Sequence, residues 1–288
     1  MWFILSLLSA LFQLLRNVAM KQLGHALDET INVWGRFTFL LPFAGAAVLI
    51  RGIPPIQDGF WMYSFLFGVA QALGTMSLSK ALKTSDISMV TSLWKLSLIL
   101  LVLWGYFALG EIPSRFGLAG LLLSLSGVYL LNVHLARVSL WAPIAAIYKD
   151  PGQRWTLGAA MGYAPSVVLI KKMALLSDAT FAVLIGYVFC SAMITPYVLF
   201  RSRIHFSGIL RYWKSFTCLG AFAALSTWFG TTAYTMTITA YVEAVKQVEV
   251  LFALMIGIFF FDETSTVRRI WPGALVMVAG LVLLKLGT

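Results

Sequence analysis

The feature that most constrains the fold is a series of apolar runs, each about 20 residues long, separated by short connections. A helix rises about 1.5 Å per residue, so about 20 residues cross the roughly 30 Å of hydrocarbon in a bilayer. Backbone polar groups need internal partners in lipid, so such runs predict membrane-spanning helices. The runs lie approximately at 2–20, 31–50, 60–79, 87–109, 116–135, 155–174, 179–200, 215–236, 241–261 and 269–286. The sequence therefore predicts an all-α integral membrane protein of about ten transmembrane helices.

The composition supports lipid as the main solvent of the surface. Hydrophobic residues make up 60% of the 288 positions and charged residues only 11%, whereas soluble domains carry about 25% charged residues. The formal net charge is +10, but the basic residues lie mostly between apolar runs. There they are typical of loops and lipid headgroups rather than of a nucleic-acid surface. We therefore expect membrane lipid, and no nucleic acid, as a partner.

Several catalytic signatures are missing from the sequence. It contains no GxxxxGK[ST] phosphate loop for ATP, no HExxH motif and no Cys/His cluster. Cys190 and Cys218 both lie inside apolar runs and have no metal-site spacing. We predict that the chain is not an enzyme and needs no cofactor.

An internal repeat relates the two halves of the chain. Gly105, Glu111, Gly120 and Gly127 are matched by Gly257, Glu263, Gly273 and Gly280. The spacing of Gly120 and Gly127 places both on one helix face, where a neighbouring backbone can approach closely. We predict one five-helix repeat over 1–135, a linker over 136–154 and a second repeat over 155–288. Because five is odd, the two repeats would enter the bilayer in opposite senses, as in carriers that work by alternating access.

Four stretches carry a resemblance to a known family. They are Gly35-Arg36-Phe37 with Phe39 and Leu40, the run Ala81 to Ser88, Leu109-Gly110-Glu111 with the glycine helix after it, and Glu249 to Ala253 followed by Asp262-Glu263. Their order and spacing resemble the drug/metabolite transporter superfamily, in its ten-span branch with paired EamA-type domains. The resemblance implies a transporter and places both termini in the cytoplasm. It also implies that Glu111 and Glu263 fix helix ends rather than touch substrate.

Two departures from that family pattern concern the fourth and ninth runs. The family commonly has a proline in each, where this chain has Leu98 and Val250. Lys95 and Lys246, in the same runs, are not general family features. The resemblance therefore implies the fold more directly than the substrate.

Charged residues inside the apolar runs are the best candidates for function. An Asp, Lys or Arg near a helix centre costs about 2.5–3.5 kcal/mol on insertion scales, so it usually faces a cavity or a partner. Lys95, with apolar neighbours on both sides, is the sharpest candidate, and an interhelical structural ion pair is the alternative. Arg16 and Arg36 are further candidates, and the alternative for Arg16 is that it snorkels to the membrane surface.

The ninth run contains three charges at i,i+3 spacing, Glu243, Lys246 and Glu249. They form either a self-neutralising ladder or a site where Glu243 or Glu249 binds a coupling ion such as a proton. Under the repeat, Trp94 and Lys95 align with Lys246 and Gln247, so each half places a lysine at similar depth. Paired lysines would suit a carboxylate or phosphate.

Aromatic and amide side chains in other runs could complete a substrate pocket, since aromatic rings attract cationic groups. The predicted substrate-binding set is Arg36, Gln71, Trp94, Lys95, Tyr163, Trp228, Glu243, Lys246 and Gln247.

The hypothesis that best combines these features is secondary active transport of a small polar metabolite by alternating access. The metabolite would be zwitterionic or anionic, such as an amino acid. A carrier or flippase of a lipid-linked sugar or lysolipid, or an organic-cation exporter, is the alternative within transport. Outside transport, a structural assembly subunit would tolerate neutral substitution of Lys95 or Lys246. The compact loops favour a bacterial inner membrane. The charge bias of the connections favours termini outside the cytoplasm, against the family resemblance.

Overall fold

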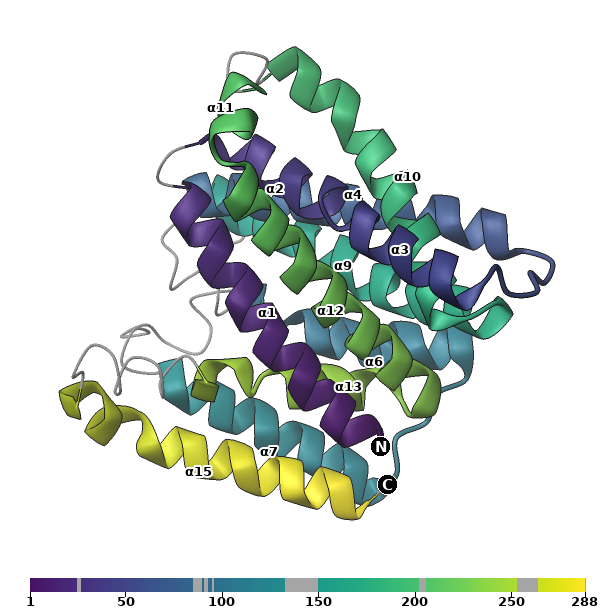
Figure 1. Cartoon of the computed structure of the whole chain (residues 1–288). Helices are drawn as coiled ribbons and strands as arrows, with labels where there is room; N and C mark the ends of the chain where they lie inside the picture. The colour runs from purple at the N-terminus through teal and green to yellow at the C-terminus, as the bar shows by residue number, and fades with distance from the viewer. Residues whose placement is uncertain are drawn as a thin grey trace.

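The chain folds into a bundle of helices (Figure 1). The computed structural model describes residues 1–24, 27–84, 90, 93, 94, 96–132, 150–201, 206–252 and 264–287, and this part contains no strand. Its helices are α1 (Trp2–Gly24), α2 (Glu29–Thr38), α3 (Leu41–Arg51), α4 (Phe60–Thr84), α6 (Leu96–Leu109), α7 (Arg115–Asn132), α9 (Pro151–Leu176), α10 (Ala179–Arg201), α11 (Phe206–Arg211), α12 (Trp213–Met236), α13 (Thr239–Lys246) and α15 (Thr264–Leu286). The predicted all-α fold is confirmed.

Five helical stretches in the described residues are long and apolar enough to cross a membrane. They are Trp2–Leu23, Thr30–Arg51, Phe60–Thr84, Pro151–Leu176 and Ala179–Arg201. Shorter apolar helices cover Ser97–Leu109, Arg115–Gly127 and Trp271–Leu286. The chain is therefore a multi-pass membrane protein.

The second apolar run, predicted as one helix over 31–50, is broken in its middle. Helix α2 ends at Thr38, and the N–H of Phe39 still donates to the carbonyl of Gly35 at 2.9 Å. Helix α3 begins at Leu41 with Pro42 in its first turn. Proline has no N–H to continue the ladder of the preceding helix, so the break falls just before it. Arg36 consequently lies in the last turn of α2.

The ninth run, predicted as one helix over 241–261, is also interrupted, after Lys246. Helix α13 ends at Lys246, and the N–H groups of Gln247 and Val248 donate to the carbonyls of Ala244 and Val245 at 3.1 and 3.0 Å. These tighter bonds interrupt the regular α pattern. Irregular backbone at membrane depth occurs where it is buried in protein or lines a cavity. Residues 253–261, which complete this run, lie outside the described part.

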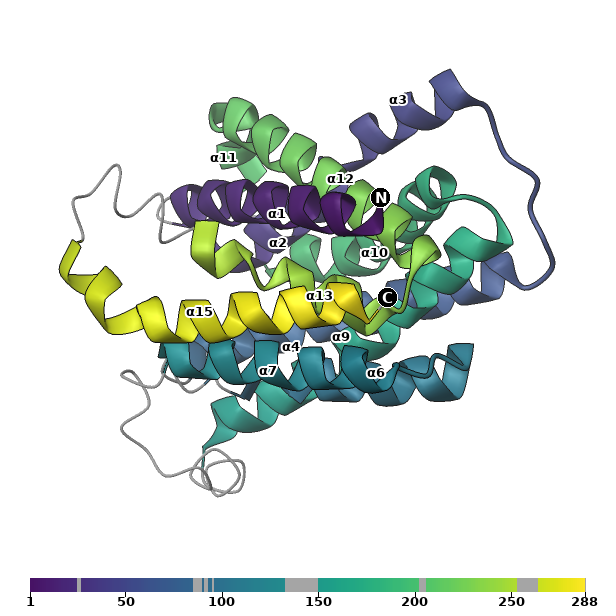
Figure 2. The ribbon, with the colours of Figure 1, turned by 90° about the horizontal axis from the view of Figure 1, so that it is seen from below.

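Helices α7 and α15 pack side by side along their length (Figure 2) through the glycines of the repeat. A Cβ on Gly127 would lie 2.2 Å from the backbone nitrogen of Met277, and a Cβ on Gly280 would lie 2.3 Å from that of Ser124. Apolar burial does not drive association between helices in lipid, so close backbone contact between small residues matters more. The predicted role of these glycines is confirmed for Gly120, Gly127 and Gly280.

Two further helix pairs pack closely, α4 with α9 and α1 with α12. Gly74 and Gly162 face one another in the first pair, where a Cβ on Gly162 would lie 2.7 Å from the Cα of Gly74. In the second pair the hydroxyls of Ser9 and Ser226 each donate to the other residue's carbonyl, at 2.8 and 3.0 Å. Each pair joins a helix of the first half to one of the second.

The predicted linker, 136–154, lies mostly outside the described residues, which omit 133–149. Helix α9 begins earlier than predicted, at Pro151, because the side chain of Asp150 accepts the N–H of Gly152 at 2.8 Å. This N-terminal cap, followed by proline in the first turn, is a common start for a helix.

The two chain ends lie at the same end of the bundle (Figure 1). The hydroxyl of Ser114 donates to the carbonyl of Gly287 at 2.9 Å, and the ammonium of Lys285 lies 5.2 Å from the ring centroid of Phe3. We call this end the terminal side. The ends of α1, α4 and α10 lie on the opposite side, because each of these helices starts on the terminal side.

A candidate substrate-binding cavity

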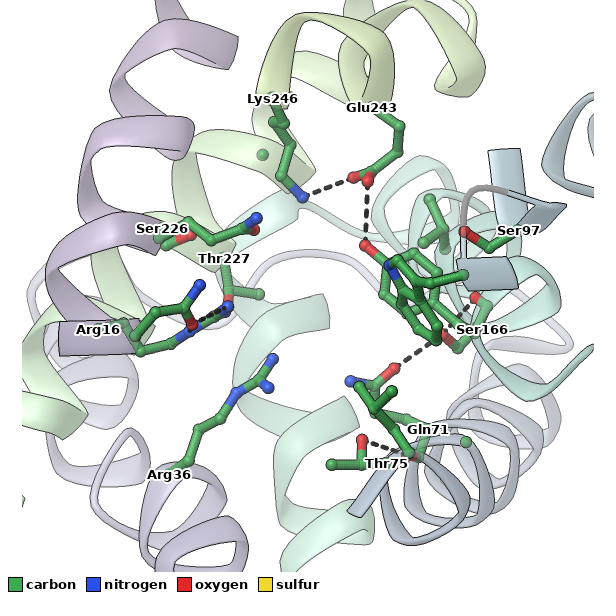
Figure 3. Close-up of a pocket in the computed structure, with 18 of the residues that line it drawn as sticks. Arg16, Arg36, Gln71, Thr75, Ser97, Ser166, Ser226, Thr227, Glu243 and Lys246 are labelled. Carbon is green, nitrogen blue, oxygen red and sulfur yellow. Dashed lines mark hydrogen bonds and ion pairs between the residues drawn. The ribbon is translucent and has the colours of Figure 1, made fainter. Parts of the chain in front are cut away.

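A cavity of about 930 Å³ lies between the two halves. Helices of both halves line it, including α1, α2 and α4 from the first and α9, α12 and α13 from the second. Ligand pockets in proteins span roughly 300–1,000 Å³, so the cavity can hold a small metabolite with water. Figure 3 shows Arg16 and Arg36 extending into it, with Glu243 and Lys246 across the space and Gln71 and Ser166 on a further wall.

A fully bonded carboxylate lies at one wall of the cavity. The Glu243 carboxylate accepts the ammonium of Lys246 at 2.5 Å and the hydroxyl of Tyr163 at 3.0 Å. The hydroxyl of Tyr234 also donates to it. Glu243 and Lys246 are 6% and 8% exposed. A buried charge is tolerated when it is paired and hydrogen-bonded, so this cluster neutralises itself, as the ladder alternative predicts.

Two arginines on the facing wall, Arg16 and Arg36, are not paired with a carboxylate of the described residues. Arg16 is 8% exposed, and its guanidinium donates to the amide oxygen of Asn17 at 3.0 and 3.2 Å. Arg36 lies over the ring of Phe37, with 5.5 Å from its guanidinium carbon to the ring centroid. The two cations repel each other. Among the described residues no carboxylate lies within salt-bridge distance of either guanidinium, so neither positive charge is neutralised by an ion pair there.

Glu249 has a third kind of environment. Its two carboxylate oxygens accept the side-chain amides of Gln13 and Asn17, each at 2.5 Å. The described residues contain no salt bridge to Glu249, although Arg16 is close enough to attract it electrostatically. The ladder predicted from its i,i+3 spacing to Lys246 therefore stops at the Glu243–Lys246 pair.

The remaining wall combines polar and aromatic groups. The hydroxyl of Ser166 donates to the amide oxygen of Gln71 at 2.7 Å, which fixes the amide between α4 and α9. The rings of Trp94 and Tyr163 lie 5.1 Å apart, centroid to centroid. Both rings line the cavity. A ligand would therefore meet π-faces beside hydrogen-bonding groups on this wall.

Comparison with known proteins identifies the first half. Residues 1–133 match the EamA-like transporter family, part of the drug/metabolite transporter superfamily. These residues belong to that family. The match implies a membrane transporter of the drug/metabolite type. A solved structure titled only "Crystal structure of protein" shares the fold over 100% of this chain and 99% of its own, with a TM-score of 0.78 and 16% identity. No curated protein matches the chain.

The structure brings most of the predicted site residues together. Arg36, Gln71, Trp94, Tyr163, Glu243, Lys246 and Gln247, together with Glu249, line the cavity. Lys95 lies outside the described residues. Trp228 does not line the cavity, because its indole N–H donates to the hydroxyl of Thr180 at 3.0 Å on α10. The cavity face of α12 instead carries Thr227, Gly230 and Tyr234.

The predicted set did not include Gln13, Arg16 or Asn17, all on α1. All three line the cavity. Their sequence signal is weak, because α1 read by itself is a plain apolar run with a snorkelling arginine. One signal was available, since Gln13, Arg16, Asn17 and Met20 follow the 3.6-residue helix period. Glu111 does not line the cavity and accepts the N–H of Thr239, the first residue of α13. This confirms its predicted role at a helix end.

Proposed function

We propose that this chain is a secondary active transporter that carries a small anionic or zwitterionic metabolite, such as an amino acid, by alternating access. The observation that carries the proposal is that the two cavity arginines have no carboxylate partner among the residues that the structure describes. Four basic side chains (Arg16, Lys21, Arg36 and Lys246) and two acidic ones (Glu243 and Glu249) line the described cavity. The excess of two positive charges favours an anionic group.

Arginine is well suited to this task. Its planar guanidinium presents several N–H donors in a fixed arrangement that matches a carboxylate or phosphate. Arg16 and Arg36 come from different helices of the same half, so one anionic group could bridge them. Hydrogen bonds to charged groups contribute about 1.5–3 kcal/mol each, enough to give a small ligand useful affinity.

The amino group of a zwitterion would meet the aromatic wall. Glu243 is already occupied by Lys246 and two tyrosines, so it offers a cation little additional attraction. The faces of Trp94 and Tyr163 remain for a cation–π contact. This distribution favours an anion or zwitterion over an organic cation.

The helix contacts support the inverted repeat that alternating access requires. If each span of the first half corresponds to the span five places later, α1 corresponds to α9 and α4 to α12. The contact of α4 with α9 then has its equivalent in the contact of α12 with α1. In the same way α6 corresponds to α13, and the contact of α6 with α9 has its equivalent in the contact of α13 with α1. Helices α7 and α15 correspond to one another and pack together. Repeats related in this way allow one half to rock against the other around a central site.

Ligand-induced thermal stabilisation of the purified protein tests the proposal. The panel contains amino acids, sugar phosphates, quaternary amines and lysolipids. A ligand at 100 times its Kd adds about 2.7 kcal/mol to the native state. We expect stabilisation by an amino acid or another small anion, its loss in Arg36→Gln, and its retention in the control Arg115→Gln, which changes an exposed arginine outside the cavity. Lys95→Gln tests the sequence-based prediction for that residue in the same assay.

Counterflow in proteoliposomes then tests transport itself. Vesicles loaded with the stabilising ligand should accumulate labelled ligand without ATP. Stabilisation by quaternary amines alone would instead favour the cation exporter. Stabilisation by lysolipids alone would favour the lipid carrier. Binding of an anion that is unchanged in Arg36→Gln would contradict the proposed site.

A further inference from the structure

A buried ion pair closes the terminal side beyond the cavity. The ammonium of Lys171 lies 2.5 Å from Glu111 Oε1, and the two side chains are only 10% and 9% exposed. Lys171 also donates to the carbonyl of Thr237 at 2.7 Å. The second carboxylate oxygen of Glu111 accepts the N–H and the hydroxyl of Thr239 at 3.0 and 2.6 Å. The charges on both residues are thus paired and hydrogen-bonded, which is what a buried pair needs to be stable.

This pair joins the two halves of the chain. Glu111 lies in the connection between α6 and α7 of the first half. Lys171 lies on α9, and Thr237 and Thr239 lie where α12 meets α13, all in the second half. A second inter-half pair, between Arg51 and Asp178 at 3.2 Å, lies on the same side and is more exposed. Both pairs therefore exist only while the halves are in contact on the terminal side.

The cavity stops short of these pairs and extends the other way. On α9 its lining ends at Ile170, the residue before Lys171, and on α13 it begins at Glu243, one turn beyond Thr239. Toward the opposite side it reaches Lys21 and Leu82, near the ends of α1 and α4. The structure is thus a conformation that is closed on the terminal side.

A second set of repeated residues connects this arrangement to the opposite side. Lys21, Asp28, Thr30 and Arg51 recur 150 positions later as Lys171, Asp178, Thr180 and Arg201. The counterpart of the Arg51–Asp178 pair is therefore Arg201 with Asp28. These two residues line a second cavity, of about 370 Å³, on the side opposite the termini.

The counterpart pair is not formed in this conformation. Asp28 pairs with Lys83 of its own half, at 3.5 Å. In the part of the chain that the structure describes, Arg201 has no ion pair. The counterpart of the buried pair would be Lys21 with Glu263, and Glu263 lies outside the described residues. The two sides therefore differ: the Arg51–Asp178 ion pair is formed, and the equivalent Asp28–Arg201 ion pair is not. All four of these residues are described by the structure.

We propose that Glu111 and Lys171 are the latch of the transport cycle. Their ion pair holds the terminal side closed, and its rupture allows the opposite side to close with Arg201 bound to Asp28. The inference rests on the proposed function, because alternating access requires the two sides to close in turn. It identifies residues outside the substrate cavity that set which side is open.

Cross-linking of the two sides in purified protein tests the latch without a known substrate. Cys190 and Cys218 are first replaced by alanine. Cysteines are then placed at Arg51 and Asp178 for the terminal side, or at Asp28 and Arg201 for the opposite side, and treated with a short bis-maleimide. The measured quantity is the ratio of cross-linking at the two sides, with and without the neutral latch variant Glu111→Gln/Lys171→Met.

We expect the latch variant to shift that ratio roughly tenfold toward the opposite side, which corresponds to about 1.4 kcal/mol. The control is Arg115→Gln, which removes an exposed positive charge close to Glu111 in the chain and on the same side. The control should leave the ratio unchanged. A ratio that the latch variant does not move would overturn the proposal.

A second measurement leaves Glu111 and Lys171 unchanged and follows the accessibility of a residue beside them. Ala240 is 1% exposed and lies beside Thr239. With the opposite side locked by the 28–201 cross-link, Ala240→Cys should become accessible to a membrane-impermeant maleimide, whereas it stays protected with the 51–178 cross-link. Equal protection under both cross-links would also overturn the latch. If the cross-linking responds as expected but no metabolite binds or is transported, the proposed substrate class fails and the latch stands.

Discussion

The latch pair and Arg16 are buried charges and Arg36 is half-buried, and the latch and the two arginines differ in how completely they are paired. Glu111 and Lys171 satisfy one another and recruit Thr237 and Thr239. Arg16 has only an amide oxygen as its hydrogen-bond acceptor among the described residues, and Arg36 faces the cavity. A buried charge that lacks a counter-charge is costly, and a ligand can remove that cost. The comparison separates charges that pair with one another from charges that we propose bind a substrate.

The largest expected effect is on the latch, where Lys171→Met leaves Glu111 buried without its cation. Breaking a buried pair by removing one partner costs about 3–5 kcal/mol. We expect that loss in the free energy of unfolding, measured by denaturant titration in detergent. The double variant Glu111→Gln/Lys171→Met should recover much of it. If Lys171→Met is no less stable than Glu111→Gln/Lys171→Met, an unpaired Glu111 is not costly and the latch does not differ from the cavity arginines in this way.

Lys246→Gln tests whether pairing or location sets the stability, because Glu243 and Lys246 form an ion pair like that of the latch but lie in the cavity. Two tyrosines continue to donate to Glu243, so we expect a smaller loss of about 1–3 kcal/mol in unfolding free energy. The assay is the same denaturant titration. A loss as large as that of Lys171→Met would show that the tyrosines do not compensate for the lost cation.

Arg16→Gln should separate binding from stability. Removal of this guanidinium relieves its repulsion with Arg36, so the free energy of unfolding without ligand should not fall. Affinity for the anionic ligand should weaken roughly tenfold or more, the equivalent of one charged hydrogen bond of about 1.5 kcal/mol. Ligand titration by thermal shift measures both quantities. A large loss of stability without ligand would make Arg16 a structural residue like Lys171.

Glu249→Gln tests the predicted coupling-ion role. A glutamine keeps one acceptor oxygen for one of the two amides, of Gln13 or Asn17, and Gln13 can turn its own amide oxygen toward the new NH2 group. It cannot release or bind a proton in the working pH range. We expect an approximately unchanged stability and a transport rate that no longer depends on the imposed proton gradient. Proteoliposome uptake at varied external pH is the measurement. If the proton gradient still drives uptake in the variant, Glu249 is not the group that binds the coupling proton.

The smallest effect is expected at Trp228, which lies outside the cavity. Trp228→Phe removes the hydrogen bond to Thr180 and should cost about 1 kcal/mol of stability with ligand affinity unchanged. Trp94→Phe, the matched substitution on the cavity wall, should weaken ligand binding instead. Equal effects of the two substitutions on affinity would mean that lining the cavity does not define the site.

The sequence by itself determined that the chain is a helical membrane protein, because apolar runs of bilayer length leave few other folds. It also identified the glycines of α7 and α15, since seven-residue spacing fixes their common face. The charges in the ninth run were visible for a similar reason. A charge in an apolar helix is conspicuous whatever surrounds it.

Only the tertiary structure decided which of those charges are paired. Glu243 and Lys246 are three residues apart, but the partners of Glu249 lie on α1 and those of Glu111 on α9 and α13. The breaks at Phe39 and Gln247 likewise depend on packing as well as on local sequence. Spacing along one helix reveals neighbours on that helix, whereas pairing across helices depends on how the two halves dock. That docking makes Lys171 part of the latch and leaves Arg16 and Arg36 exposed to a ligand.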